Sequence, residues 1–186
     1  MKLQFSFPDR IIPDQFGMNV SEHQQVEGIN PQSFPFEIND LSEATKFVAW
    51  KLIDYDTVPM FGFPWTHWLV ADVAVKANQL IIPADFSRQT DAPQGENSLH
   101  SVVQDLRAPW WKLRAKHTWL EQHYAGPRPK SGTHRYQLTV YGFERSLELP
   151  NGFSLAELMA HVTDDKVTEI AFQNLLYTKD SALSKD

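Results

Sequence analysis

The chain has 186 residues, of which 42% are hydrophobic and 12% aromatic, so it can bury a substantial core as one domain. Its 17 basic and 23 acidic side chains give a net charge of −6, which argues against general nucleic-acid binding and against adhesion to anionic membranes. The absence of cysteine excludes disulfides, thiol nucleophiles and zinc–thiolate sites. No signal-peptide pattern and no membrane-spanning apolar run is found, so we expect a cytoplasmic protein without stable membrane insertion.

Alternation of apolar and polar residues predicts four β-strands. In chain order they cover residues 3–7, 45–56, 65–75 and 133–143. In the third of these, the alternation places His67 on the same face as Leu69 and Ala71. Most of the 12 prolines fall between the strands, where they are typical of loops.

Two segments have helical spacing of their apolar residues. Residues 154–162 begin with Ser154 and Glu157 in the spacing of a capping box. Residues 106–124 carry apolar residues at steps of three and four, with Pro109 in the first turn. The sequence therefore predicts a mostly-β domain with a few helices.

Polar side chains occur in phase with the core-facing residues at the ends of three predicted strands. They are Asp54, His67, and His134 together with Tyr136. A half-buried polar group needs a hydrogen-bonding partner or a ligand, so these strand ends are expected to line a pocket. Imidazole and phenol groups donate hydrogen bonds, and a carboxylate can orient an imidazole; this combination favours a small anion such as phosphate. Trp65 and Trp68, on either side of His67, are candidates for apolar pocket walls.

Several motifs, in order along nearly the whole chain, make it similar to the phosphatidylethanolamine-binding protein family. The sequence "DYD" at residues 54–56 resembles the family's Asp-Pro-Asp element, and "WTHWLV" resembles its Trp-x-His strand. "QGENS" is similar to the Gly-x-Asn-Ser turn of the bacterial, Raf-kinase-inhibitor-like branch. "YAGPRPKSGTHRY" resembles the Gly-Pro turn that leads into His-Arg-Tyr, which is the most specific of these matches.

The resemblance implies an antiparallel β-sandwich with peripheral helices and a pocket for phosphate or phosphorylated headgroups. By matching position, that pocket would use Asp54, Asp56, Trp65, His67, Pro129, His134 and Tyr136. It implies no cofactor and no required metal, and it implies a homodimer, since bacterial relatives are often dimers. The chain departs from the family at Tyr55 and Lys130, where prolines are usual. It also carries a basic, Trp-rich insert, for which we expect helical structure at about residues 98–123 within the single domain 1–186.

Three functions remain open on the sequence alone. The first is a binding protein, without catalytic residues, for a phosphate-bearing small molecule or a lipid headgroup. The second is a protein-interaction module of the kinase- or protease-inhibitor kind, acting on a protein partner through its surface. The third is a metal-assisted phosphoester hydrolase, although the sequence has no His-x-x-His or His-Glu-x-x-His spacing.

Overall fold

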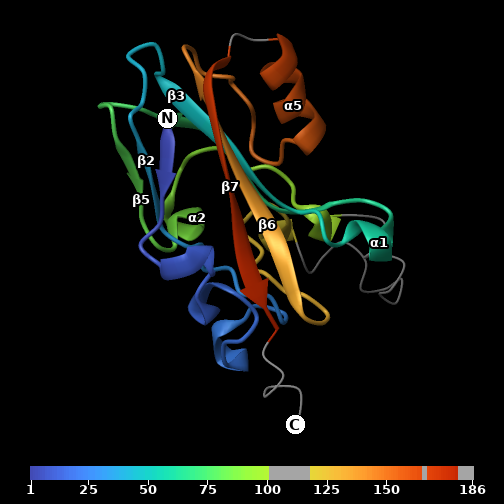
Figure 1. Ribbon diagram of the computed structural model, residues 1–186. Helices are drawn as coiled ribbons and strands as arrows, with labels where there is room; N and C mark the ends of the chain where they lie inside the picture. Colours follow the sequence, from blue (N-terminus) through green and yellow to red (C-terminus); the bar gives the residue numbers. More distant parts are fainter. Residues whose placement is uncertain (101–117, 165–166, 180–186) are drawn as a thin grey trace.

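Two antiparallel β-sheets form the body of the protein (Figure 1). The computed structural model describes residues 1–100, 118–164 and 167–179. One sheet has the strand order β1-β2-β5 and the other the order β4-β3-β6-β7. The strands are β1 (Lys2–Gln4), β2 (Phe36–Asn39), β3 (Phe47–Asp54), β4 (Trp65–Ala74), β5 (Leu80–Ile82), β6 (Thr133–Phe143) and β7 (Val167–Thr178). The predicted mostly-β sandwich is thereby confirmed.

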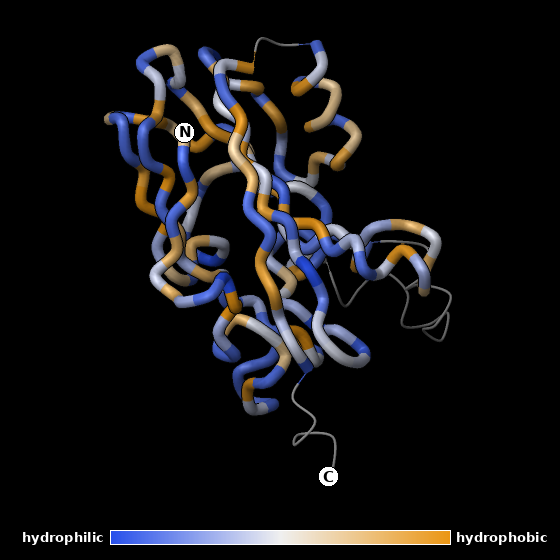
Figure 2. Tube along the Cα trace, viewed as in Figure 1, coloured by the Kyte–Doolittle hydropathy of each residue, from blue (hydrophilic) through white to orange (hydrophobic). Residues whose placement is uncertain are grey.

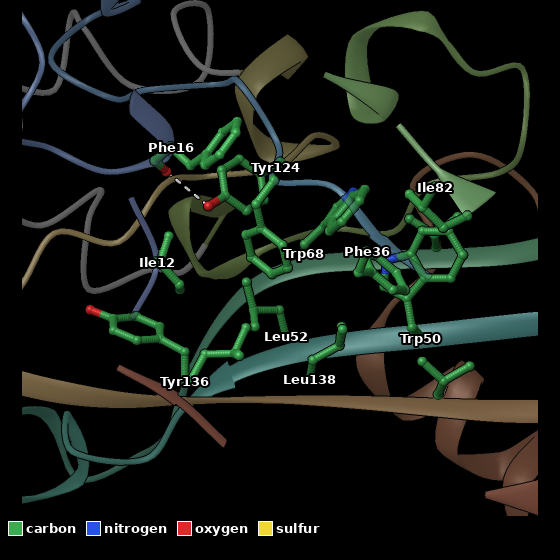
Figure 3. Close-up of a cluster of buried hydrophobic side chains, with 14 of the residues drawn as sticks. Ile12, Phe16, Phe36, Trp50, Leu52, Trp68, Ile82, Tyr124, Tyr136 and Leu138 are labelled. Atoms are coloured by element: carbon green, nitrogen blue, oxygen red, sulfur yellow. Dashed lines mark hydrogen bonds between the residues drawn. The ribbon is translucent and has the colours of Figure 1, made fainter. Parts of the chain in front are cut away.

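The main hydrophobic core lies between the two sheets and is rich in aromatic side chains (Figure 3). Trp50 on β3 contacts Phe36 of the opposite sheet edge-to-face, with ring centroids 5.5 Å apart, and Trp68 on β4 in the same manner at 5.2 Å. Edge-to-face aromatic pairs stabilise a core by about 0.5–1.5 kcal/mol beyond the burial of their surface. Because the rings come from both sheets, these contacts fix the sheets against one another.

The sequence predicted β3, β4 and β6 well and the other strands poorly. The strands expected at residues 45–56, 65–75 and 133–143 are observed as β3, β4 and β6. The strand expected at residues 3–7 ends earlier, at Gln4, and β2, β5 and β7 were not predicted. Hydrophobic and hydrophilic residues follow each other along the central strands, which is the pattern that made these strands detectable (Figure 2).

Helices are few and lie outside the sheets (Figure 1). The predicted helix at residues 154–162 is confirmed as α5 (Leu155–Asp164), and Ser154 and Glu157 form the expected reciprocal capping bonds at 3.2 and 2.7 Å. Most of the helix predicted at 106–124, and of the insert at 98–123, lies outside the described residues. The other α-helices of the described residues are single turns, α1 (Val58–Phe61), α2 (Phe86–Gln89) and α4 (Thr118–Glu121). Within the described part of the chain, no helix is long and apolar enough to cross a membrane.

Candidate functional site

A pocket of about 490 Å³ lies where the C-terminal end of β3, the start of β4 and the start of β6 meet. Antiparallel pairing places Asp54 opposite both Trp65 and Tyr136, which brings the predicted polar strand ends to one edge of the sheet. The wall is completed by loop residues from distant parts of the chain. The lining residues are Met18, Glu27, Ile29, Asp54, Thr57, Met60, Phe61, Trp65, His67, Leu99, Ala125, Gly126, Arg128, Pro129, Lys130, His134 and Lys179.

His134 and Asp54 form a buried pair in the pocket wall. The His134 Nδ1 atom lies 2.7 Å from Asp54 Oδ2, and the two side chains are 10% and 3% exposed. The other oxygen of Asp54 accepts a bond of 2.8 Å from the backbone N–H of Asp56. Because a carboxylate only accepts, it holds the proton on Nδ1 of His134 and orients the ring. The Nε2 atom of His134 is left for the pocket.

His67 reaches the pocket because β4 contains a β-bulge. Leu52 pairs with Trp68 and Ile53 with Thr66, so His67 is an extra residue with no partner on β3. The prediction that His67 shares a face with Leu69 and Ala71 was therefore wrong. Leu69 and Ala71 pack beneath α5, in a second hydrophobic cluster that does not include His67. The bulge shifts the side-chain alternation along the strand, so His67 contacts Tyr136, with ring centroids 5.1 Å apart.

A backbone carbonyl fixes the ring of His67. Its Nδ1 atom lies 2.6 Å from the carbonyl oxygen of Ala125, and the N–H of Ala125 donates to the carbonyl of His67 at 2.9 Å. Burial lowers the pKa of His67, with His134 acting in the same direction, and these effects outweigh the opposing effects of the Ala125 carbonyl and Asp54. His67 is therefore neutral near pH 7, with its proton on Nδ1.

Loss of stability in mild acid is expected from this buried neutral histidine. The folded pKa of His67 is lowered, so below about pH 6.5 the unfolded chain takes up a proton that the folded chain does not. The free energy of unfolding should fall between pH 7 and 5 by up to about 1.4 kcal/mol per pH unit for this group. Urea unfolding of the wild type and of His67→Gln at several pH values between 7 and 5 measures this change in the free energy of unfolding.

The free energy of unfolding of His67→Gln should change less with pH than that of the wild type, whatever the absolute stability of the variant. His123, whose pKa burial also lowers, lies outside the pocket and adds a second pH dependence that His123→Gln removes. Carboxylates with a lowered pKa, such as Asp56 and Glu169, also stabilise the folded state, but they lose this contribution to stability only at more acidic pH. An identical slope in wild type and His67→Gln between pH 7 and 5 would show that His67 is not held neutral.

Three cationic side chains surround the pocket mouth, and sequence reasoning singled out only part of this set. Lys130, noted as a departure from the family, has its Nζ atom 5.1 Å from the centroid of the Phe61 ring. Lys179 Nζ donates to the backbone carbonyl of Lys130 at 3.3 Å, and the exposed Arg128 joins them. Glu27 is the acidic residue of the rim. Lys179 follows β7, a strand that the sequence did not predict, so its position could not be foreseen.

Aromatic and aliphatic side chains form the remaining wall. Trp65 is 8% exposed and packs against Phe61 and Phe63, with ring centroids 5.4 and 6.2 Å away. Pro129 also lines the pocket and is buried. Trp68, a candidate wall in the sequence, belongs instead to the main core, where its Nε1–H donates to Gln94 at 2.9 Å. The pocket thus has an apolar side beside its two imidazoles.

The Gly-Pro turn is needed for a close approach of three chain segments. The N–H of Gly126 donates to the carbonyl of Asn30 at 2.8 Å. A Cβ atom at Gly126 would lie 2.8 Å from the carbonyl oxygens of both Asn30 and Phe16, closer than such contacts occur. Since these are backbone atoms, they cannot rotate away. Glycine therefore allows residues 125–130 to sit against the N-terminal loops and close the pocket.

Two of the predicted site residues lie outside the pocket lining. Asp56 forms an ion pair with Arg135, whose Nη2 lies 2.6 Å away, and this contact lowers the pKa of Asp56. Tyr136 is fully buried behind His67, and burial raises the pKa of its phenol far above the usual value. Among the described residues its hydroxyl has no hydrogen-bond partner. Direct contact of either residue with a ligand stays a prediction. Tyr136 contacts the ring of His67, and Asp56 holds Arg135, which follows His134 in the chain.

No ready-made metal centre is found in the described residues: no group of three or more histidine, aspartate or glutamate side chains lies close enough together to hold an ion. Asp54 is engaged by His134 and by the N–H of Asp56. The pocket residues as placed are suited to holding a ligand by hydrogen bonds and charge.

Comparisons with known proteins agree with this architecture. Residues 6–174 match the family described as "Phosphatidylethanolamine-binding protein". The chain is 31% identical, over 87% of its length and 91% of the relative's, to the uncharacterized protein YxkA of Bacillus subtilis. In fold it is similar to the putative homologue CT736 of Chlamydia trachomatis (TM-score 0.69, 21% identity, 96% and 97% of the two chains). It is also similar to Escherichia coli YbcL (TM-score 0.67, 17% identity, 96% and 98% of the two chains). The chain therefore belongs to the phosphatidylethanolamine-binding protein family.

Proposed function

We propose that the protein is a binding protein whose pocket holds a phosphate-bearing small molecule or a phospholipid headgroup, without a chemical step. The observation that carries this proposal is the meeting of His67 and His134 in one pocket. Each ring has its Nδ1 atom engaged by an acceptor and its Nε2 atom left over. Two imidazoles held in this way present both Nε2 atoms to one ligand in the pocket.

Charge and shape at the pocket mouth support an anionic ligand with an organic part. Arg128, Lys130 and Lys179 supply positive charge around the opening, although the whole chain has a net charge of −6. Trp65 and Phe61 offer an apolar surface to the rest of the molecule. A pocket of about 490 Å³ exceeds the size of inorganic phosphate and lies in the range of small-molecule sites.

Calorimetric titration with phosphate, phosphoethanolamine and ethanolamine tests the proposal. Each charge-assisted hydrogen bond contributes about 1.5–3 kcal/mol before the costs of desolvation and immobilisation. We therefore expect weak binding of phosphate, tighter binding of phosphoethanolamine and no binding of ethanolamine, which lacks the anion. Equal heats for ethanolamine and phosphoethanolamine would contradict an anion pocket.

A protein-interaction module is the second candidate, because apolar side chains are exposed beside the pocket. Tyr55, Val58 and Met60 are 44%, 40% and 44% exposed, and Met60 also lines the pocket. A protein partner at this rim would cover them. Such binding should depend on Val58 and Met60 and should survive replacement of His134, which separates it from the anion pocket.

A further inference from the structure

Both pocket histidines have the same nitrogen committed to an acceptor. His67 Nδ1 lies 2.6 Å from the carbonyl oxygen of Ala125, which can only accept. His134 Nδ1 lies 2.7 Å from Asp54 Oδ2, which as a carboxylate also only accepts. The proton of each neutral ring is therefore on Nδ1. A neutral ring with its proton on Nδ1 presents an unprotonated Nε2, which is itself an acceptor.

The two Nε2 atoms are open to the pocket. Both rings line it, and among the described residues neither Nε2 has a hydrogen-bond partner. In the described part of the chain, the completely buried side-chain polar atoms without a partner are Trp50 Nε1 and Tyr136 Oη. The two Nε2 atoms also lack a partner but are not in this set, so each is accessible from the pocket. An anion that approaches two lone pairs is repelled, because an acceptor faces an acceptor. Anion binding therefore requires at least one additional proton between the ligand and these rings.

The two rings face different acceptors. His134 faces the Asp54 carboxylate at hydrogen-bond distance. His67 has only the Ala125 carbonyl, and burial lowers its pKa, so the empty pocket holds no proton on its Nε2. The ionisable and charged groups around His67 are Asp54 on β3, His134 and Tyr136 on β6, Arg128 and Lys130 in the loop before β6, Lys179 after β7, and Glu27.

A phosphate monoester can supply the missing proton itself. Its second pKa is about 6, so near neutral pH its protonated oxygen is readily available to donate to a lone pair. A phosphodiester or a sulfate monoester has no such proton in this range. For those ligands the proton has to be placed on the buried His67, against its desolvation.

We propose that the pocket binds its anion together with one proton, shared with Nε2 of His67, and thereby selects phosphate monoesters over sulfate monoesters. This inference rests on the proposed function and names the ligand class of the same site. His67 is the residue that determines the selection, and His134 is held in the pocket wall by its hydrogen bond to Asp54.

The test counts protons during binding. Phosphoethanolamine and its sulfate analogue, 2-aminoethyl sulfate, are titrated into the protein at pH 7.5 in buffers of different ionisation heat. We expect uptake of close to one proton with phosphoethanolamine, and an affinity that falls about tenfold per unit between pH 7 and 8. We expect the sulfate analogue to bind at least about tenfold more weakly.

Two variants assign the proton to His67. In His67→Gln an amide N–H replaces the lone pair, so phosphoethanolamine should bind without proton uptake and the preference over the sulfate analogue should disappear. His123→Gln is the matched control, because His123 Nδ1 also bonds a backbone carbonyl, of Trp119, at 2.6 Å but lies outside the pocket. It should keep both the uptake and the preference.

The outcomes separate the two proposals. Binding of phosphoethanolamine to the wild type without proton uptake, or equal affinity for the sulfate analogue, would overturn the proton-coupled selection and leave the anion pocket standing. No binding of either anion would refute the anion pocket and the selection together. The wild-type measurements alone distinguish the anion pocket from the proton-coupled selection, even where His67→Gln fails to fold.

Discussion

Replacing His134 with alanine is expected to lower the affinity for phosphoethanolamine by about 100-fold or more. The variant loses a charge-assisted hydrogen bond worth about 1.5–3 kcal/mol. It also leaves the buried Asp54 carboxylate in the pocket wall without its partner, where it repels the anion. Calorimetric titration of the variant measures the change.

Two further variants show whether the loss belongs to the Nε2 atom of His134. His134→Asn keeps a side-chain N–H for Asp54, and so the fold of the wall, but lacks an atom at the Nε2 position. It should lose affinity as strongly as His134→Ala. His23→Ala changes an exposed histidine whose partner is Ser21, and should bind as the wild type does. Wild-type affinity in His134→Asn would show that this ring does not hold the ligand.

Replacing Trp68 with alanine is expected to destabilise the fold by about 3–5 kcal/mol. Its side chain is fully buried and contacts Trp50 and Tyr124 edge-to-face (Figure 3). Its Nε1–H donates to Gln94 at 2.9 Å. The substitution leaves a cavity between the sheets and a Gln94 oxygen without this donor. Urea unfolding followed by circular dichroism measures the effect.

A second tryptophan provides the comparison for Trp68. Trp119→Ala removes a side chain that is 44% exposed and stacks on His123, so it should change stability by less than about 1 kcal/mol. Under conditions in which Trp68→Ala is folded, it should still bind phosphoethanolamine, because Trp68 does not line the pocket. Near-native stability of Trp68→Ala would contradict its place in the core.

Much of the sandwich could be predicted because core residues recur at every second position, as Trp50 and Leu52 do on β3 and Leu138 and Val140 on β6. The strands that were missed lack that signal. β5 has three residues, and on β7 the apolar Ile170 and Phe172 are 54% and 64% exposed on the sheet edge, so its pattern does not mark a buried face. Strands such as β5 and β7 are specified by their neighbours in space and not by their own periodicity.

The centre of the pocket could be predicted, but its rim and its exact geometry could not. Asp54, Trp65, His67, Pro129 and His134 were expected on resemblance and strand phase, and all line the pocket. The reason for the position of His67 is a β-bulge, which no alternation pattern indicates. Rim residues such as Met18 and Lys179 come from segments far away in the sequence, and only the tertiary fold brings them together.

The central claim is that His67 and His134 together hold an anion through their Nε2 atoms. The most direct measurement is ¹⁵N NMR of the imidazole nitrogens while phosphoethanolamine is added. Of the seven histidines, we expect His67 and His134 to be protonated on Nδ1 in the free protein and to show large Nε2 shifts on titration, with the other five unchanged. Saturable binding that leaves both Nε2 signals unmoved would contradict the account.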